Sequence, residues 1–213
     1  MLNSIITLYI QRWEWFLQLL IEHICICAIA IAFAGVSGLL LGIYISEKTR
    51  IAPVVLGSVN MLYTIPSISL LGLLIPFLGI GNGTAITALT AYALLPMVRN
   101  TYAGLTSIDT EIIEAAQGMG STSFQILFRI KLPLAMSIII AGLRNMVVMT
   151  IAVAGIASFI GAGGLGVAIF RGITTNNAAM TFAGSLLIAL LAISCDLLLG
   201  KLEKYLKERM RLN

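Results

Sequence analysis

The chain has 213 residues, of which 59% are hydrophobic and 10% are charged, and its formal net charge at pH 7 is +4. Soluble domains carry about 25% charged residues, so this composition excludes an ordinary soluble enzyme and indicates a protein of the lipid bilayer. The basic residues lie at the ends of apolar runs, without interleaved aromatic residues, which excludes a nucleic-acid-binding stripe. The spacing of Cys25, Cys27 and Cys195 suits neither a disulfide framework nor a metal site.

Residues 1–22 are expected to form a helix at the membrane interface, because Trp13 and Trp15 stand beside Arg12 and Glu14. A cleaved signal peptide is not expected, since the stretch lacks a basic start and a small-residue cleavage site. The first membrane span is predicted at residues 24–45, a length above the roughly 20 residues that cross the hydrocarbon layer.

Four further spans are predicted, which makes the chain an all-α membrane protein with five transmembrane helices. They cover residues 53–78, 84–102, 134–159 and 178–199. Pro66 and Pro76 should kink the second span, because proline removes a helical hydrogen bond. Residues 160–177 form a glycine-rich, polar connection. No soluble domain has room, so residues 1–213 are predicted to form a single transmembrane domain.

Residues 109–132 are the only long polar interval between spans, and they predict two short surface helices. Asp109 is expected to cap the first helix, which ends at Gly118 and Gly120. Thr122 and Gln125 have the spacing of a capping box at the start of the second helix, which is expected to stop before Pro133.

The distribution of basic residues predicts an outside N-terminus and an inside C-terminus. Residues 46–52, 99–133 and 200–213 hold ten of the 13 Lys and Arg residues, whereas the opposite side holds only Arg12 and Arg171. Cytoplasmic loops carry an excess of Lys and Arg. The surface helices at 109–132 and the basic tail at 200–213 are therefore placed in the cytoplasm.

Five motifs carry a resemblance to a known family. The stretch Glu114-Ala115-Ala116-Gln117-Gly118-Met119-Gly120, followed by Leu132-Pro133, resembles the EAA loop of permease subunits of binding-protein-dependent ABC importers. Residues 64–67 (TIPS), 74–81 (LIPFLGIG), 92–100 (YALLPMVRN) and 160–166 (IGAGGLG) resemble the osmoprotectant permeases, which import glycine betaine, carnitine or choline. The resemblance covers about residues 20–200. It implies the MetI-like fold of type I importers and a place in the bacterial cytoplasmic membrane.

The resemblance also implies partners and coupling residues. In that family the EAA loop is a coupling helix in a groove of a cytoplasmic ATPase, and the matching residues here are Glu114, Ala115, Ala116, Gly118, Met119 and Gly120. At the elbow between the two surface helices either Gly118 or Gly120 is expected to take the left-handed conformation, and the family pattern favours Gly118. Expected partners are an ABC ATPase dimer, a second permease copy or homologue, an extracytoplasmic substrate-binding protein and membrane lipid. Because the chain lacks G-x-x-x-x-G-K-[ST], no cofactor is expected on it, and ATP and Mg²⁺ are expected on the ATPase.

Polar residues inside the predicted spans are candidates for a translocation path. Arg144 is placed near mid-bilayer, where an unpaired charge is costly, so it should face protein or water. Asn60 and Asn145 are placed at comparable depth. Two interpretations of Arg144 stay open: a strut between helices that reaches towards Asp196, or a residue that lines the path.

The glycine-rich connection offers a second candidate site. Gly161, Gly163 and Gly166 match G-x-G-x-x-G, but a dinucleotide site requires a preceding strand, so a cofactor role is rejected. Together with Gly164 they form either a tight turn between spans or, as the resemblance suggests, an extracytoplasmic gating or docking turn.

Three other functions have some support in the sequence. Gly35-Val36-Ser37-Gly38 resembles the serine motif of rhomboid proteases, but His23 would stand about 21 Å from Ser37 along one helix, too far to act as a base. Small residues there are better explained as a packing face. The other rivals are an importer of the same architecture for an amino acid or other small solute, and a passive channel.

Overall fold

The structure is a computed structural model that describes residues 2–210, and these residues form only helices and connecting turns. Residues 1 and 211–213, which include Arg211 of the predicted basic tail, lie outside the described residues. The α-helices are α1 (Leu2–Gln11), α2 (Trp13–Glu47), α3 (Ala52–Thr64), α4 (Ser67–Leu78), α5 (Asn82–Thr106), α6 (Thr110–Gly118), α7 (Ser123–Ile126), α8 (Leu132–Ala154), α9 (Gly166–Thr174) and α10 (Ala178–Met210). A π-turn, Leu127–Lys131, joins α7 to α8, and a 3-10 turn covers Ala157–Ile160.

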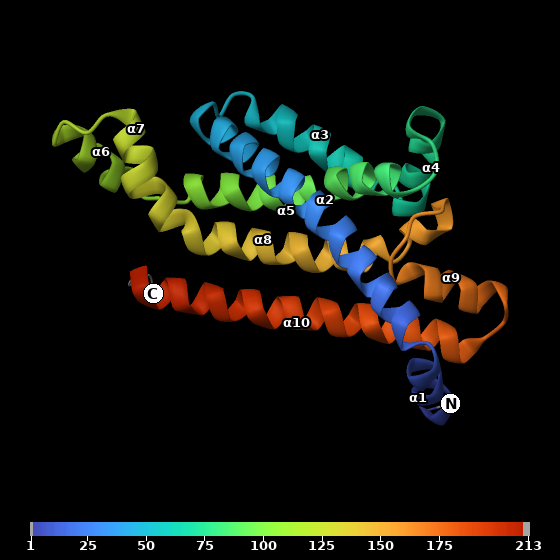
Figure 1. Cartoon of the computed structure of the whole chain (residues 1–213). Coiled ribbons are helices and arrows are strands. Elements are labelled where there is room, and N and C mark those ends of the chain that lie inside the picture. Colours follow the sequence, from blue (N-terminus) through green and yellow to red (C-terminus); the bar gives the residue numbers. More distant parts are fainter. Residues whose placement is uncertain (1, 211–213) are drawn as a thin grey trace.

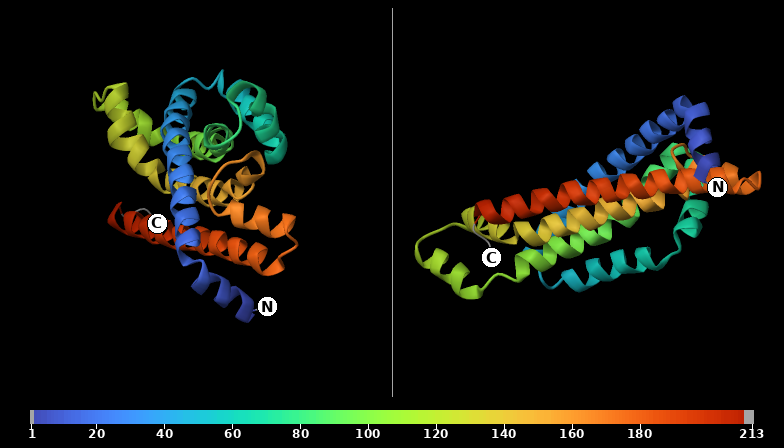
Figure 2. Two further views of the ribbon diagram at one scale, coloured as in Figure 1. Left: turned by 45° about the vertical axis from the view of Figure 1, so that its right-hand side comes forward. Right: turned by 90° about the horizontal axis from the view of Figure 1, so that it is seen from below.

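Helices α2, α5, α8 and α10 form the body of the molecule (Figures 1 and 2). Helix α5 packs between α2 and α8, while α10 packs against α8 and α9. Helices α6 and α7 project from one end of this body, and α1, α4 and α9 lie at the opposite end (Figure 1). The fold therefore has two distinct ends joined by long helices.

Small residues allow α2 and α5 to approach closely. Ala34, Gly38 and Gly42 are buried on one face of α2. A Cβ added at Gly42 would lie only 2.5 Å from the Cβ of Thr101 on α5. The predicted packing face at residues 34, 35, 37 and 38 is thus confirmed in part: Ala34 and Gly38 are buried, Gly35 is partly buried and Ser37 is exposed. The buried His23 contacts the Ile151 carbonyl oxygen at 3.1 Å instead of Ser37.

Gly42→Ala is expected to lower the stability of the protein in detergent by about 1–3 kcal/mol, because the added methyl group forces α2 and α5 apart. Gly57→Ala is the matched control, since a Cβ at this glycine of α3 meets nothing within 4 Å. It should be neutral or stabilising by up to roughly 1 kcal/mol. The measurement is thermal unfolding followed by circular dichroism. Equal midpoints for the two variants would contradict the close approach.

The prediction of one kinked helix over residues 53–78 is wrong. Helix α3 ends at Thr64, α4 begins at Ser67, and their axes differ by 97°. Pro66 causes the break because it lacks an N–H and disfavours the helical conformation at the preceding Ile65, which is extended (φ −68°, ψ 126°). The Tyr92 hydroxyl donates to the Ile65 carbonyl oxygen at the break.

Length and hydropathy identify three membrane-crossing helical stretches among the described residues, or four with the bent α3–α4 pair. The three stretches are Trp13–Glu47, Ser123–Ala154 and Ala178–Glu208. Helix α5, which contains the predicted third span, is not among them; its neighbours α2 and α8 cover it, so its residues need not be apolar enough for lipid. The five-span count stays a prediction.

The ends of several helices differ from expectation. Helix α1 ends at Gln11, so residues 13–22 belong to the long α2 and not to one interfacial helix over 1–22. The connection at 160–177 contains α9, and the predicted tail continues α10 as far as Met210. In each case a helix extends where the sequence suggested a boundary, since neighbouring helices offer packing that local sequence does not reveal.

The surface helices follow the prediction in part. The capping box is confirmed: Thr122 Oγ1 accepts from the Gln125 N–H at 3.3 Å, and the Gln125 side chain accepts from the Thr122 N–H at 2.9 Å. Asp109 occupies the N-cap position of α6 without a side-chain hydrogen bond to the helix. Gly120 takes the left-handed conformation (φ 83°), whereas Gly118 is the last helical residue, so the expectation for Gly118 is wrong.

The second surface helix also does not stop before Pro133. The π-turn carries the chain from α7 directly into α8, with Pro133 in the first turn of α8. The Leu132 N–H donates to the Leu127 carbonyl oxygen, five residues back, so the pattern of helical hydrogen bonds is already widened at this point. The helix can therefore continue although Pro133 lacks an N–H donor. Helix α7, the π-turn and α8 therefore form one continuous helical rod over Ser123–Ala154, and α6 precedes it across a turn.

Candidate functional site

A polar cleft of about 530 Å³ opens on the side of the body where α3, α5, α8 and α10 meet. Its lining combines charged, amide and aromatic side chains with apolar ones. The lining residues are Tyr63, Leu95, Pro96, Arg99, Asn100, Asn145, Val148, Met149, Ala152 and Asp196. A cleft with a few convergent polar groups on an apolar wall is the usual form of a small-molecule site.

Local contacts hold several of these side chains in place. The Asn100 side-chain amide donates to the Pro96 carbonyl oxygen at 2.7 Å. The Tyr63 hydroxyl contacts the Met149 sulfur at 3.3 Å, and its ring meets that of Tyr92 edge-on with centroids 5.8 Å apart. The tyrosines at 63 and 92, which look scattered in the sequence, are thus neighbours, and Tyr63 presents an aromatic face at the cleft.

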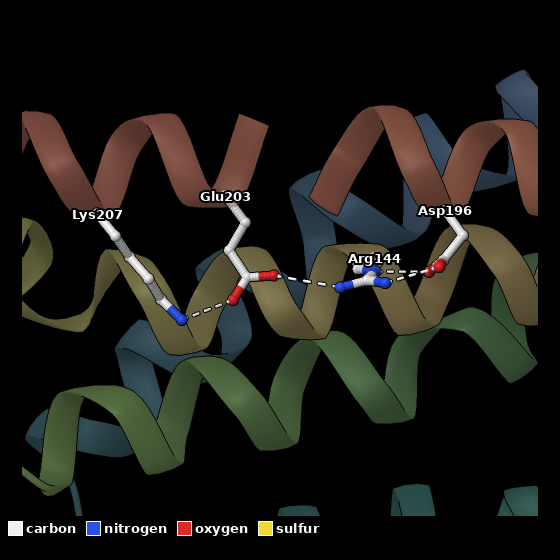
Figure 3. A network of polar contacts seen from close by, with 4 residues as sticks. All are labelled: Arg144, Asp196, Glu203 and Lys207. Carbon is white, nitrogen blue, oxygen red and sulfur yellow. Dashed lines mark hydrogen bonds and ion pairs between the residues drawn. The ribbon is translucent and has the colours of Figure 1, made fainter. Parts of the chain in front are cut away.

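Beside the cleft, Arg144 forms a two-pronged ion pair with Asp196. Its Nε and Nη2 lie 2.5 Å and 2.6 Å from the two carboxylate oxygens, and Nη1 lies 3.6 Å from Glu203 (Figure 3). Lys207 extends the network to Glu203 at 2.9 Å. A Cβ added at Gly200 would lie 3.3 Å from the Arg144 Cζ, so a small residue on α10 leaves room for the guanidinium. The network ties α8 to α10.

The three predicted path residues are separated. Asn145 lines the cleft, Arg144 points to α10, and Asn60 is exposed on α3 outside the cleft lining. Arg99 and Asn100 also line the cleft, which the sequence did not predict, although they are polar residues near the end of a predicted span. Their place near the end of the predicted span at 84–102 is the feature of the sequence that could have identified them. Only the packing of α5 against α8 places them beside Asn145.

The glycine turn between α8 and α9 is fastened to two other helices. The Gly163 N–H donates to the Asn82 side chain at 2.9 Å, and the Gly164 N–H donates to the Glu22 carboxylate at 3.1 Å. Gly161 and Gly164 have left-handed backbones (φ 74° and 91°). Gly166 packs against the Gly155 carbonyl oxygen with no space for a side chain. This geometry is a tight, anchored turn, and a gating role for it stays a prediction.

The predicted coupling residues lie on and just after α6. Ala116 is buried, whereas Glu114, Ala115, Gly118 and Gly120 are exposed, and the Met119 side chain is 87% exposed. Phe124 and Phe128 in the following segment are also exposed, at 69% and 51%. Helix α6 makes its packing contacts with α7 and projects from the body (Figure 1). Exposed apolar residues on a projecting helix are typical of a docking surface.

No group of three or more His, Cys, Asp or Glu side chains in the described part of the chain is arranged to hold a metal ion. Among those residues, Cys25, Cys27 and Cys195 are free thiols.

Residues 34–212 match the family described as "Binding-protein-dependent transport system inner membrane component". The chain belongs to this family. The permease is 40% identical over 206 residues to the glycine betaine/carnitine/choline transport system permease protein OpuCD of Bacillus subtilis (strain 168), covering 96% of this chain and 90% of that protein. It is 45% identical over 161 residues to the ergothioneine transport permease/ergothioneine binding protein EgtU of Helicobacter pylori (strain G27), covering 76% of this chain but 29% of that protein.

The fold agrees with this assignment. The permease superposes on the MetNI methionine ABC transporter in an inward-facing conformation with a TM-score of 0.82 and 25% identity, covering 90% of this chain and 96% of that one. The predicted all-α, MetI-like fold and the resemblance to osmoprotectant permeases are confirmed. The permease is thus a membrane-spanning component of an ABC importer, and its family implies an ATPase and a substrate-binding protein as partners.

Proposed function

We propose that this permease carries a compatible solute of the glycine betaine, carnitine or choline class across the cytoplasmic membrane, driven by ATP hydrolysis on a separate subunit. The observation that carries the proposal is the 40% identity to OpuCD, which extends over 96% of the chain. The permease itself binds no ATP or Mg²⁺ and is not an enzyme. Two permease copies, or this one and a homologue, enclose the path.

The cleft and α6 support a mechanism of alternating access. Tyr63, Arg99 and Asn145 place an aromatic ring, a cation and an amide on one wall. The ring suits the quaternary ammonium group that all three solutes share, and the cation suits the carboxylate of glycine betaine and carnitine. A second permease supplies the opposite wall. Closure of the ATPase dimer pushes α6, and the continuous rod of α7, π-turn and α8 transmits the movement to the cleft.

Purification of the tagged permease from its host membrane tests this proposal. We expect an ABC ATPase to copurify and reconstituted vesicles to accumulate labelled glycine betaine, carnitine or choline with ATP and the cognate binding protein. A permease that purifies alone and conducts solute without ATP is a passive channel, which contradicts the proposal.

The EgtU identity favours ergothioneine as a second candidate solute. Ligand-induced fluorescence change of the cognate binding protein separates the candidates. Binding of ergothioneine, and of none of the three osmoprotectants, would replace the proposed substrate class.

We also propose that the N-terminus lies outside and α6 inside. In a variant with Cys25, Cys27 and Cys195 replaced by serine, a new cysteine at Ser121 should react with a membrane-impermeant maleimide only after the cells are opened. A cysteine at the exposed Thr175, between α9 and α10, is the matched control and should react from outside. The reverse labelling pattern would invert the topology.

A further inference from the structure

Arg12 and Arg171 meet in one surface hollow, although they lie near opposite ends of the sequence. The hollow has a volume of about 330 Å³ and is lined by Gln11, Arg12, Trp13, Glu14, Trp15 and Arg171. Arg12 stands at the break between α1 and α2, and Arg171 comes from α9. These elements lie together at the end of the molecule opposite α6 (Figure 1).

The charge of this hollow favours an anion. Among the described residues, neither Arg12 nor Arg171 takes part in an ion pair. The Arg171 guanidinium lies over the Trp15 ring at 5.8 Å, which holds it beside the hollow. Glu14 supplies one opposing carboxylate, so two guanidinium groups leave a net positive charge. A guanidinium is well suited to a phosphate group because its donors form a planar fork.

An apolar groove adjoins the hollow and shares Trp13 with it. The groove has a volume of about 290 Å³, and its lining is Tyr9, Trp13, Phe16, Leu17, Leu20 and Leu187. Leu17 and Leu20 follow Trp13 along α2 by about 6 Å and 10 Å, so the groove leads from the interface into the bilayer. The Tyr9 hydroxyl donates to the Ala183 carbonyl oxygen at 2.8 Å, which fixes α1 against α10.

We propose that the hollow and the groove together bind one glycerophospholipid molecule. Its phosphodiester lies between Arg12 and Arg171, and one acyl chain follows the groove along α2 towards Leu187. Trp13 borders both the hollow and the groove, and tryptophan is enriched at the membrane–water interface, where the phosphate of a lipid lies. The lipid bridges α1, α2, α9 and α10, four helices that meet at this end of the molecule.

The two tryptophans of the chain, Trp13 and Trp15, both line the hollow and report directly on it. The permease is purified in detergent with its accompanying subunits, and phosphatidylglycerol with dibrominated acyl chains is added. The signal of a Trp13→Phe/Trp15→Phe complex is subtracted as background. We expect saturable quenching with half-effect at a mole fraction about tenfold lower than for dibrominated diacylglycerol, which lacks the phosphate.

Arg12→Gln/Arg171→Gln should remove this tenfold preference, and Arg12→Lys/Arg171→Lys should restore part of it. Arg50→Gln/Lys201→Gln removes the same charge elsewhere and should keep the preference. Equal quenching by the two bromolipids in the wild type, or an undiminished preference in the glutamine variant, would overturn the proposal. Inorganic phosphate at about 20 mM is enough to occupy an anion site with a Kd in the millimolar range. Relief of quenching at that concentration would assign the arginines to free phosphate instead.

Discussion

Replacing Gly118 with aspartate is expected to abolish solute-stimulated ATP hydrolysis by the assembled importer while membrane insertion of the permease stays normal. Gly118 is the exposed last residue of α6, and a Cβ there meets nothing within 4 Å. Its backbone is helical, so a side chain fits without strain, and the carboxylate near the C-terminal end of α6 costs only about 0.3–1 kcal/mol against the helix dipole. The fold therefore offers no reason for the variant to fail.

The proposed contact with the ATPase does offer one. A carboxylate beside the 87% exposed Met119 would be buried without a partner when α6 docks. Such a burial costs several kcal/mol, enough for a loss of about a hundredfold or more in affinity. The measurements are stimulated ATPase activity and the amount of ATPase recovered on the purified permease.

Gly118→Ala is the matched control, because it adds a methyl group without charge and should keep most of the activity. Gly120→Ala should behave differently from both: with φ at 83°, a side chain strains the elbow itself by roughly 1–2 kcal/mol. Wild-type coupling and ATPase recovery for Gly118→Asp would remove α6 from the proposed interface.

Arg144→Leu is expected to lower transport about tenfold or more, through poor assembly, lost activity or both. The substitution leaves Asp196 without the guanidinium that meets both its oxygens, and Glu203 loses its contact at 3.6 Å (Figure 3). Removing one partner of such a pair is more harmful than removing both. Lys204→Leu is the control, since it breaks only the exposed pair with Glu208 at 3.9 Å.

The double variant Arg144→Leu/Asp196→Leu separates the two interpretations of Arg144. If the pair is a strut between α8 and α10, the double variant should recover both membrane abundance and transport. If the pair serves the path, abundance should recover and transport should stay low, because Asp196 lines the cleft. A single variant with full transport would contradict both interpretations. We expect recovery, since the Arg144 side chain points to α10 and not into the cleft.

The sequence by itself determined the properties that depend on neighbouring residues along the chain. Hydropathy predicted the membrane class, and the Thr122–Gln125 spacing predicted a capping box that the structure contains. Small residues at 34, 35, 37 and 38 predicted a packing face for the same reason, and Ala34 and Gly38, four residues apart on one helix face, are the two that are buried. The five motifs of the sequence analysis, which are short local patterns, predicted the family that the comparisons confirm.

Only the tertiary structure decided what depends on the rotation and packing of helices. The sequence predicted a span at residues 84–102, but helix α5, which contains it, is not among the helices apolar enough to face lipid, and its packing between α2 and α8 is visible only in the structure. Pro66 predicted a kink, yet the 97° turn depends on where α4 can pack. For Arg144 the sequence left a strut towards Asp196 and a place in the path both open, and only the structure shows the pair formed. The meeting of Arg12 with Arg171 was not predicted and joins residues far apart in sequence. Which charge faces which is set by the angle of each residue about its helix axis and by the neighbour that α8, α9 or α10 happens to meet there, and no local pattern encodes that neighbour.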